Sequence, residues 1–306
     1  MVSMFMDQFS FTALWNPSFM ILTIALGVAY LWIVGSAREH IPGSAPVPKK
    51  QKVTFLIGLV VFYFAYGGPL YILGHVMFSA HMAQMGVLFF VAPPLLLLGS
   101  PSWFFTWMNE IRVLNRIYKA VLNPFIGLIL FNVLLSFYHL PSLLDFLMMN
   151  YTLHRIFQFL LFSTALLMWW HIVAPVPDRS NLSELKRIAY LFGNSGLLLP
   201  ACAMIIFATG PLYATYNDPN LWSLALGYCL PPGSSVPPEL FSQLNLFSPG
   251  EDQQLGGIIM KLAQETMFMT FLVKIFTQWV RREKKVANIE EYQRPYASAY
   301  SAATNK

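Results

Sequence analysis

The stretch "MFSAHMAQMGVLFFVAPPLLLLG", residues 77–99, decides the fold class, because it is long and apolar enough to cross a lipid bilayer as a helix. It contains one histidine and no aspartate, glutamate, lysine or arginine. About 20 apolar residues in helical conformation span the hydrocarbon core of a membrane. A run of this kind is not typical of a soluble domain.

Six further runs of similar character place most of the chain in a bilayer. Hydrophobic residues make up 56% of the 306 residues and charged residues only 11%, and the mean hydropathy is +0.54. Soluble globular domains carry about 25% charged residues. Because backbone polar groups in lipid must be paired internally, the sequence predicts an all-α integral membrane protein, a seven-transmembrane helix bundle within residues 1–280. The runs lie near residues 17–37, 53–73, 77–99, 121–139, 152–174, 188–210 and 255–280.

Lysine and arginine gather in every second connection between these runs. Basic residues occupy segments 37–53, 100–120 and 175–187 and the tail 281–306, whereas the N-terminal sixteen residues and the loop 211–254 contain none. Positive loops face the cytoplasm, so we predict the N-terminus and the long loop outside and the basic tail in the cytoplasm. The net charge of +5 is thus split among segments that can contact lipid headgroups, which argues against a nucleic-acid partner.

Four of the six histidines converge on the predicted outer face. His75 and His81 lie at the start of the third run, His139 at the end of the fourth and His154 at the start of the fifth. Buried polar groups in a membrane usually mark a functional site. We therefore expect these histidines to form one cluster, although a histidine at a helix end can also simply bond water or a carbonyl group.

Methionines line up with one of these histidines. At 100° per residue, Met77, His81 and Met85 share one helical stripe, with Gln84 beside it. Thioether and imidazole donors together favour copper, particularly Cu(I), over harder ions. Methionine is also an ordinary gap-filler in apolar helices, so packing stays open as an alternative. Two histidines from different helices could instead ligate haem.

The seventh run carries two charges at membrane depth. Lys261 and Glu265 stand one helical turn apart, with Gln254 close to them in angle. An unpaired charge in hydrocarbon is expensive, so we expect a mutual ion pair or a pair with Arg155 of the fifth run. Such a pair either locks the seventh helix to the fifth or serves catalysis or proton transfer.

The long loop 211–254 interrupts the pattern of short connections. Its stretch "PNLWSLAL" predicts a short interfacial helix with Trp222 at headgroup depth. Loops longer than about 15 residues usually bind something or remain mobile. The chain contains no P-loop, HExxH or GxSxG motif and no defensible nucleophile and base pair, so an enzyme is not expected.

Several motifs, taken in order, resemble one membrane-protein family. They are "GHVMFSAHMAQM", "VAPPLLLLGSP", "YHLPSLLDF", "LHRIFQFLLF" and "DQQLGGIIMK", and they run from the third to the seventh predicted helix. This pattern is similar to the Bacillus-type cytochrome c oxidase assembly factor CtaG family. The positions that carry the family's motifs are His81, Met82, Gln84, Pro93, His139, Pro141, His154, Asp252, Gln253, Gln254 and Gly257.

The resemblance implies a multi-pass protein of the bacterial plasma membrane that is needed for active cytochrome c oxidase. Broader relatives often have a histidine where Met85 and Gln158 stand here, so a mixed histidine and methionine site is the better expectation for this chain. The implied partners are oxidase subunit I, which would receive copper, and an extracytoplasmic copper donor. A membrane haem-binding protein and a metal-free scaffold for oxidase folding remain alternatives.

The candidate residues therefore form two groups. The expected metal ligands are His81, His139, His154, Met77, Met85 and His75. Further functional or structural polar residues are Gln84, Gln158, Asp252, Gln253, Gln254, Lys261, Glu265 and Arg155.

Overall fold

The fold is known from a computed structural model, which describes residues 9–108, 110, 123–176, 182–230 and 236–304. These residues form helices, turns and irregular segments without strands, which confirms the predicted all-α class. The principal helices are α2 (Phe11–Trp15), α3 (Pro17–Val34), α4 (Lys49–Tyr66), α5 (Pro69–Val76), α6 (Phe78–Gly86), α7 (Ala92–Gly99), α8 (Ser102–Met108), α10 (Pro124–Tyr138), α11 (Pro141–Met148), α12 (Tyr151–Val173), α13 (Glu184–Ile206), α14 (Pro219–Gly227), α15 (Leu240–Leu244) and α16 (Pro249–Thr304).

Five helical segments within the described residues are long and apolar enough to cross a membrane, or six if one bent pair counts as a span. The predicted number of seven is therefore not confirmed. The five are Phe11–Val34, Lys49–Val76, Phe78–Gly99, Tyr151–Val173 and Glu184–Ile206. The chain is thus a multi-pass helical membrane protein.

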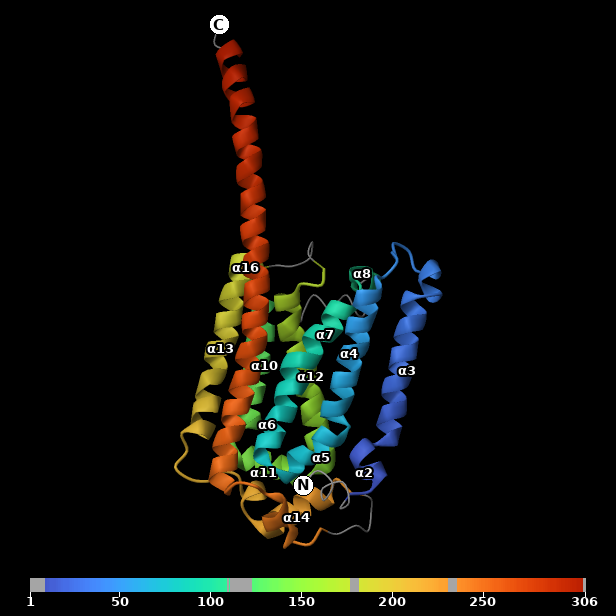
Figure 1. The fold of residues 1–306 in the computed structure, drawn as a ribbon, viewed down its shortest axis with the longest axis vertical. Coiled ribbons are helices and arrows are strands. Elements are labelled where there is room, and N and C mark those ends of the chain that lie inside the picture. The colour runs from blue at the N-terminus through green and yellow to red at the C-terminus, as the bar shows by residue number, and fades with distance from the viewer. Residues whose placement is uncertain (1–8, 109, 111–122, 177–181, 231–235, 305–306) are drawn as a thin grey trace.

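The fourth and seventh predicted runs account for the difference. The fourth is the bent pair, because α10 stops at Tyr138 and α11 leaves at 76°, with Pro141 as its first residue. The seventh belongs to α16. Within its otherwise apolar segment 255–280, Lys261, Glu265 and neighbouring glutamines lower the mean hydropathy. Figure 1 shows α16 continuing far beyond the bundle. It begins inside the segment predicted as a loop and includes the predicted tail as far as Thr304.

The turn between the second and third runs lies later than the sequence predicts. Gly67 and Gly68 break the second span into α4 and α5, and α5 continues to Val76. Met77 alone then adopts extended backbone angles, φ −131° and ψ 139°, before α6 begins. His75 therefore ends the second span instead of starting the third, which corrects its predicted place.

A π-helical turn, η2 (Val87–Val91), joins α6 to α7 where two prolines interrupt the hydrogen-bond pattern. Pro93 has no N–H to donate to the carbonyl four residues earlier. That carbonyl, of Phe89, accepts a hydrogen bond of 2.8 Å from the buried indole Nε1 of Trp169 on α12. The central span is thereby tied to α12 at the point where its own backbone bond is missing.

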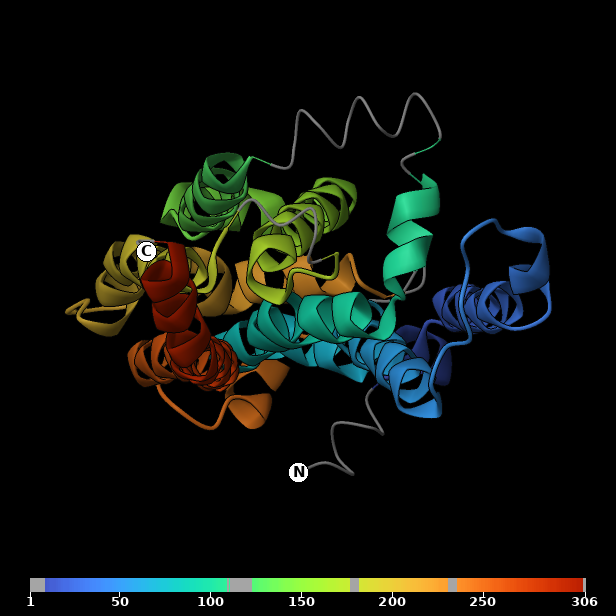
Figure 2. The same ribbon diagram turned by 90° about the horizontal axis from the view of Figure 1, so that it is seen from above.

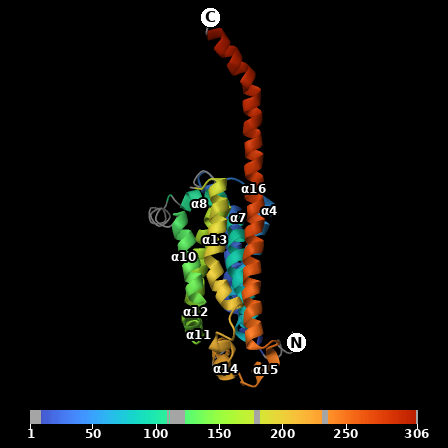
Figure 3. The same cartoon turned by 90° about the vertical axis from the view of Figure 1, so that its left-hand side faces the viewer.

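The α6–α7 span lies at the centre of the bundle and packs against α4, α12 and α16. Figure 2 shows α3 at the periphery, in agreement with the 11% of its apolar window that is buried. Figure 3 shows α14 and α15 together beyond the ends of the long helices. We call this the capped end, and we call the opposite end, from which α16 projects, the tail end.

Candidate functional site

Three predicted ligands meet in the interior at the capped end. His75 of α5, His81 of α6 and His154 of α12 are each no more than 2% exposed. The ring centroids of His75 and His154 lie 5.3 Å apart, and those of His81 and His154 lie 6.2 Å apart. His139, directly after α10, is also buried, and its ring centroid lies 5.3 Å from that of Tyr138, the neighbour of His81 and His154. The predicted convergence of these histidines is seen in the fold.

Tyr138, the last residue of α10, lies between two of these histidines. Its hydroxyl oxygen is 2.7 Å from Nε2 of His154 and 3.2 Å from Nε2 of His81. The side chain is fully buried. Tyr138 is not among the residues that the sequence predicted for the site, although its place directly before His139 in "FYHLP" offered a signal.

Two of the histidines are held in a defined tautomer by their own helices. Nδ1 of His75 lies 3.0 Å from the carbonyl oxygen of Tyr71, and Nδ1 of His139 lies 2.7 Å from that of Leu135. A carbonyl can only accept, so both Nδ1 atoms carry the proton and each Nε2 keeps a lone pair. Metal-ligating histidines are commonly oriented by such second bonds. Nε2 of His139 is buried without a partner in the protein.

The two methionine candidates have different surroundings. Met85 is fully buried one turn beyond His81, and its sulfur lies 3.9 Å from Nε2 of Gln158. Met85 and Gln158, the two positions at which the resemblance implies histidines in broader relatives, therefore contact each other. Met77 packs against the apolar residues under α14, and its extended backbone removes it from the helical stripe predicted with His81.

Gln84 closes the cluster toward α4. Its Nε2 donates to the carbonyl of Ala65 at 2.9 Å, and its Oε1 is buried without a partner in the protein. Gly74 allows this approach, because a Cβ there would lie 2.7 Å from Oε1 of Gln84 and 3.2 Å from Cα of His81. The close contact of α5 with α6 therefore depends on a glycine.

The cluster offers pairs of nitrogen donors instead of a preformed multidentate cage. Within the described residues, no three His, Cys, Asp or Glu side chains converge closely enough to hold an ion together. Soft donors with few ligands suit Cu(I), which tolerates low coordination, better than ions that require many oxygen ligands. The arrangement suits an ion that is held briefly.

The loop between α13 and α16 covers this cluster. The hydroxyl of Tyr213 donates to the carbonyl of His139 at 2.8 Å, and that of Tyr216 donates to the carbonyl of Gly74 at 2.6 Å. Burial raises the pKa of Tyr216 well above its ordinary value, so its hydroxyl stays protonated as a donor. Asp145 of α11 accepts hydrogen bonds from the backbone of Ala214 and Thr215 and holds the start of the loop.

Trp222 corrects the prediction of an interfacial anchor. The stretch around it forms α14 as expected, but Trp222 is fully buried, and its Nε1 donates to the carbonyl of Val76 at 3.0 Å. Its indole stands edge-on to Phe241 of α15. The tryptophan fastens the loop to α5 because its apolar ring and single donor both find partners inside the protein.

The first turn of α16 fixes two neighbouring elements. Asp252 accepts hydrogen bonds from the backbone N–H groups of Phe78 at 2.6 Å and Ser79 at 3.2 Å, so it caps α6 from another helix. Gln253 accepts from the N–H of Leu212 and donates to the carbonyl of Ile205. Gln254 is exposed and makes one long hydrogen bond, of 3.4 Å, to the carbonyl of Ala208. Its helical angle predicted a place beside Lys261 and Glu265, but it makes no hydrogen bond to either residue.

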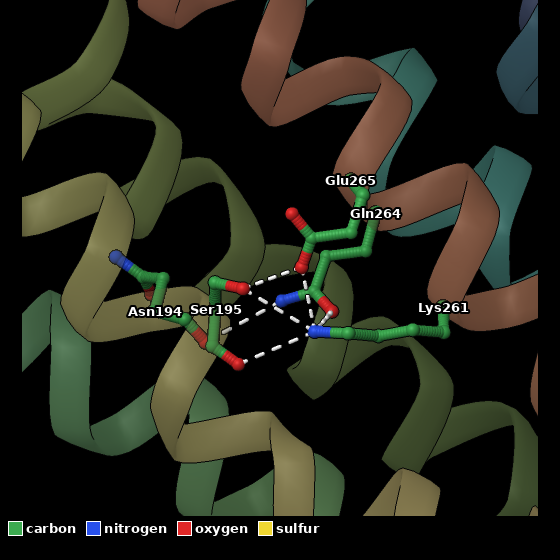
Figure 4. A network of polar contacts seen from close by, with 5 residues as sticks. All are labelled: Asn194, Ser195, Lys261, Gln264 and Glu265. Atoms are coloured by element: carbon green, nitrogen blue, oxygen red, sulfur yellow. Dashed lines mark hydrogen bonds and ion pairs between the residues drawn. The ribbon is translucent and has the colours of Figure 1, made fainter.

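A polar network joins α16 to α13 (Figure 4). Lys261 Nζ lies 2.6 Å from Glu265 Oε1. This is the mutual ion pair, one of the two pairings that the sequence predicted. Ser195 donates a hydrogen bond to Glu265, and Lys261 donates to the Ser195 carbonyl and to Gln264. The pair thus connects the seventh predicted helix to the sixth, not to the fifth.

Arg155 is not part of this network, which corrects the alternative pairing. Its guanidinium carbon lies 3.9 Å from the ring centroid of Tyr66 and 4.8 Å from that of Tyr71, and it donates to the carbonyl of Tyr66. Aromatic faces and a carbonyl group partly replace its hydration. Arg155 therefore holds α12 against α4 and α5 beside the histidine cluster.

The family model described as "Cytochrome c oxidase caa3 assembly factor (Caa3_CtaG)" matches residues 28–282, which include the cluster, the loop and the α16 network. The chain belongs to the Caa3_CtaG family. The resemblance in the motifs is thereby confirmed.

Relatives of this Caa3_CtaG chain occur in mycobacteria. "Uncharacterized protein ML1998" of Mycobacterium leprae is 24% identical over 291 residues, which cover 88% of this chain and 39% of that protein. "Uncharacterized protein Mb0105" of Mycobacterium bovis is 24% identical over 270 residues, 80% of this chain and 36% of that protein. The chain thus spans less than two-fifths of the length of these relatives. No solved structure matches it.

Proposed function

We propose that this Caa3_CtaG protein assists the assembly of cytochrome c oxidase by holding a copper ion at the histidine cluster and passing it to oxidase subunit I. Copper is the cargo, and the protein acts as a carrier without catalysing a reaction. His81 and His154 are the main ligands, with His139 and His75 at the loop side and Met85 as a soft ligand one turn deeper. An extracytoplasmic donor supplies the ion.

One observation carries the proposal. Four buried histidines from separate elements meet in an apolar interior, and two of them keep an Nε2 lone pair because a carbonyl group fixes the proton on Nδ1. Packing alone does not require imidazoles at this depth, since each loses hydration when it is buried. The partnerless Nε2 of His139 is a free donor for an arriving ion.

The charge pattern supports the direction of delivery. Lysine and arginine are concentrated in segments 37–53, 100–120, 175–187 and 281–306, and this pattern supports an orientation with the capped end and its cluster on the outer side of a bacterial plasma membrane. A carrier with its ion near the outer leaflet could meet an oxidase subunit by lateral diffusion. Gating by the covering loop would then separate loading from transfer.

Metal analysis of the purified protein tests the proposal. Wild type is compared with a His81→Ala/His154→Ala variant, and His40→Ala, an exposed histidine at the tail end, is the control. After loading with Cu(I) and desalting, wild type and the control should retain copper and the double variant should lose it. An absorption spectrum of the same samples detects haem.

Two results would contradict copper carriage. A Soret band that disappears in the double variant would make the cluster a haem site. Protein without copper or haem, together with normal oxidase assembly in the double variant, would identify a scaffold whose histidines are structural.

A further inference from the structure

We propose that the hydroxyl of Tyr138 occupies the copper site when the ion is absent, and that it must be displaced before His81 and His154 can bind the ion together. The inference rests on the proposed copper function and concerns how that site is controlled. It makes Tyr138 a built-in competitor of the cargo.

The hydrogen-bond geometry of Tyr138 leads to this conclusion. Its oxygen is within hydrogen-bonding distance of both Nε2 atoms, at 2.7 Å and 3.2 Å. A phenol has one proton, so it can donate to only one of the two imidazoles, and the other must donate to the phenol oxygen from a protonated Nε2. Without the ion, at least one of the two rings therefore carries its proton on Nε2.

Copper binding reverses this arrangement. An ion bound by both Nε2 atoms needs the lone pair of each, so the protonated ring must move its proton from Nε2 to Nδ1. The bonds between the ion and its donor break as two Cu–N bonds form, both hydrogen bonds of Tyr138 break, and no proton leaves the protein in this step. The Nδ1 atoms of His81 and His154 are without partners in the protein and are free to carry protons.

The residues around Tyr138 determine how strongly its hydroxyl competes with copper for the two histidines. Tyr138, His81 and His154 are buried, so no bulk water replaces the hydrogen bonds that the hydroxyl loses. Phe157 and His139 stand against the ring of Tyr138 and restrict where it can move. The loss of two hydrogen bonds to imidazoles favours return of the hydroxyl to its ion-free position. The site thereby holds copper more weakly than two histidines alone, as transfer to a partner requires.

Cu(I) titration against a chromophoric chelator tests this directly. Tyr138→Phe removes the hydroxyl and keeps the ring, and it should bind Cu(I) about tenfold more tightly than wild type. Tyr30→Phe is the matched control, because this buried tyrosine of α3 donates its hydroxyl to the backbone carbonyl of Gly99 and lies outside the cluster. Its affinity should match that of wild type. A residue that merely supported the cluster would weaken binding when changed, so the sign of the effect separates the two roles.

The ring nitrogens report on the same step without a variant. In ¹⁵N-histidine NMR spectra, ion-free wild type should show at least one of the two histidines protonated at Nε2, and Cu(I) should leave both in the Nδ1–H form. Lone pairs on both Nε2 atoms before copper addition, or unchanged or weaker binding in Tyr138→Phe, would overturn the inference alone. If neither wild type nor Tyr138→Phe takes up Cu(I), the proposed copper function fails as well.

Discussion

At the residue scale, Asp252 connects the start of α16 with the helix that carries His81. Its carboxylate accepts two backbone N–H groups at the beginning of α6, where unpaired donors and the helix dipole favour a negative charge. We expect Asp252→Ala to lower the free energy of unfolding by about 1–2 kcal/mol. Thermal unfolding in detergent measures this, with the exposed Gln254→Ala as control. Equal midpoints for the two variants would show that the cap is dispensable.

Cys229, in the loop directly after α14, gives a pH-dependent prediction. Burial raises the pKa of its thiol to about 12, whereas a free cysteine has a pKa near 8.5. Only the thiolate reacts with maleimides, so labelling of the folded protein at pH 8 should be at least about a hundredfold slower than that of an exposed cysteine. The rate should rise about tenfold per pH unit. Peptide mass spectrometry measures it, and rapid labelling at pH 8 would contradict the tight packing of the loop.

Residue types alone revealed part of the site. Histidines near helix ends can be assigned to one face from topology, and His81 and His154 meet as expected. Tyr138 could not be assigned, because a tyrosine in an apolar helix is equally suited to packing or to an interface. Met77 was misplaced, since one extended residue changes the helical phase and no strong breaker marks it.

At the element scale, the ion pair of α16 tests whether the seventh predicted helix is held structurally. The side chains of Lys261 and Glu265 are 21% and 32% exposed, so the pair lies at the surface of the bundle. Removing one partner leaves an uncompensated charge, whereas removing both does not. We expect Glu265→Leu to destabilise the protein by about 2–3 kcal/mol and the double variant Lys261→Leu/Glu265→Leu by less.

Thermal unfolding and oxidase assembly separate the two roles left open for this pair. The double variant should restore most of the stability and support normal oxidase assembly. Restored stability with lost assembly would instead indicate that the charges take part in function. Met269→Leu, an exposed apolar change on the same helix, is the control.

The breaks between elements explain most errors in the predicted boundaries. Hydropathy identifies apolar runs, but it does not show where a run bends. The 76° turn between α10 and α11 and the short turn at Met77 depend on packing against other helices.

At the scale of the whole molecule, orientation is the main expectation to test. Ser242 of α15 is exposed at the capped end, and Lys284 of α16 is exposed at the tail end. In intact cells, a membrane-impermeant maleimide should label a Ser242→Cys variant and leave Lys284→Cys unlabelled until the cells are lysed. The reverse pattern would place the histidine cluster on the cytoplasmic side and contradict delivery at the outer leaflet.

The membrane-protein class was predictable from composition. The position of the loop over the histidine cluster was not. A chain with 56% hydrophobic residues must bury most of its surface in lipid or protein. Whether loop 211–254 lies over the cluster depends on tertiary contacts from Tyr213, Tyr216 and Trp222, which have no periodic signal in the sequence. The loop closes the site from the side on which copper is proposed to enter.

The copper content of the oxidase itself tests the central proposal most directly. Cytochrome c oxidase is purified from cells whose own copy of this gene is replaced by wild type, His81→Ala or His40→Ala, with equal levels of each protein in the membrane. Copper bound by subunit I and oxidase activity should be normal with wild type and His40→Ala and lost with His81→Ala. Fully loaded, active oxidase in the His81→Ala cells would contradict a copper route through the histidine cluster.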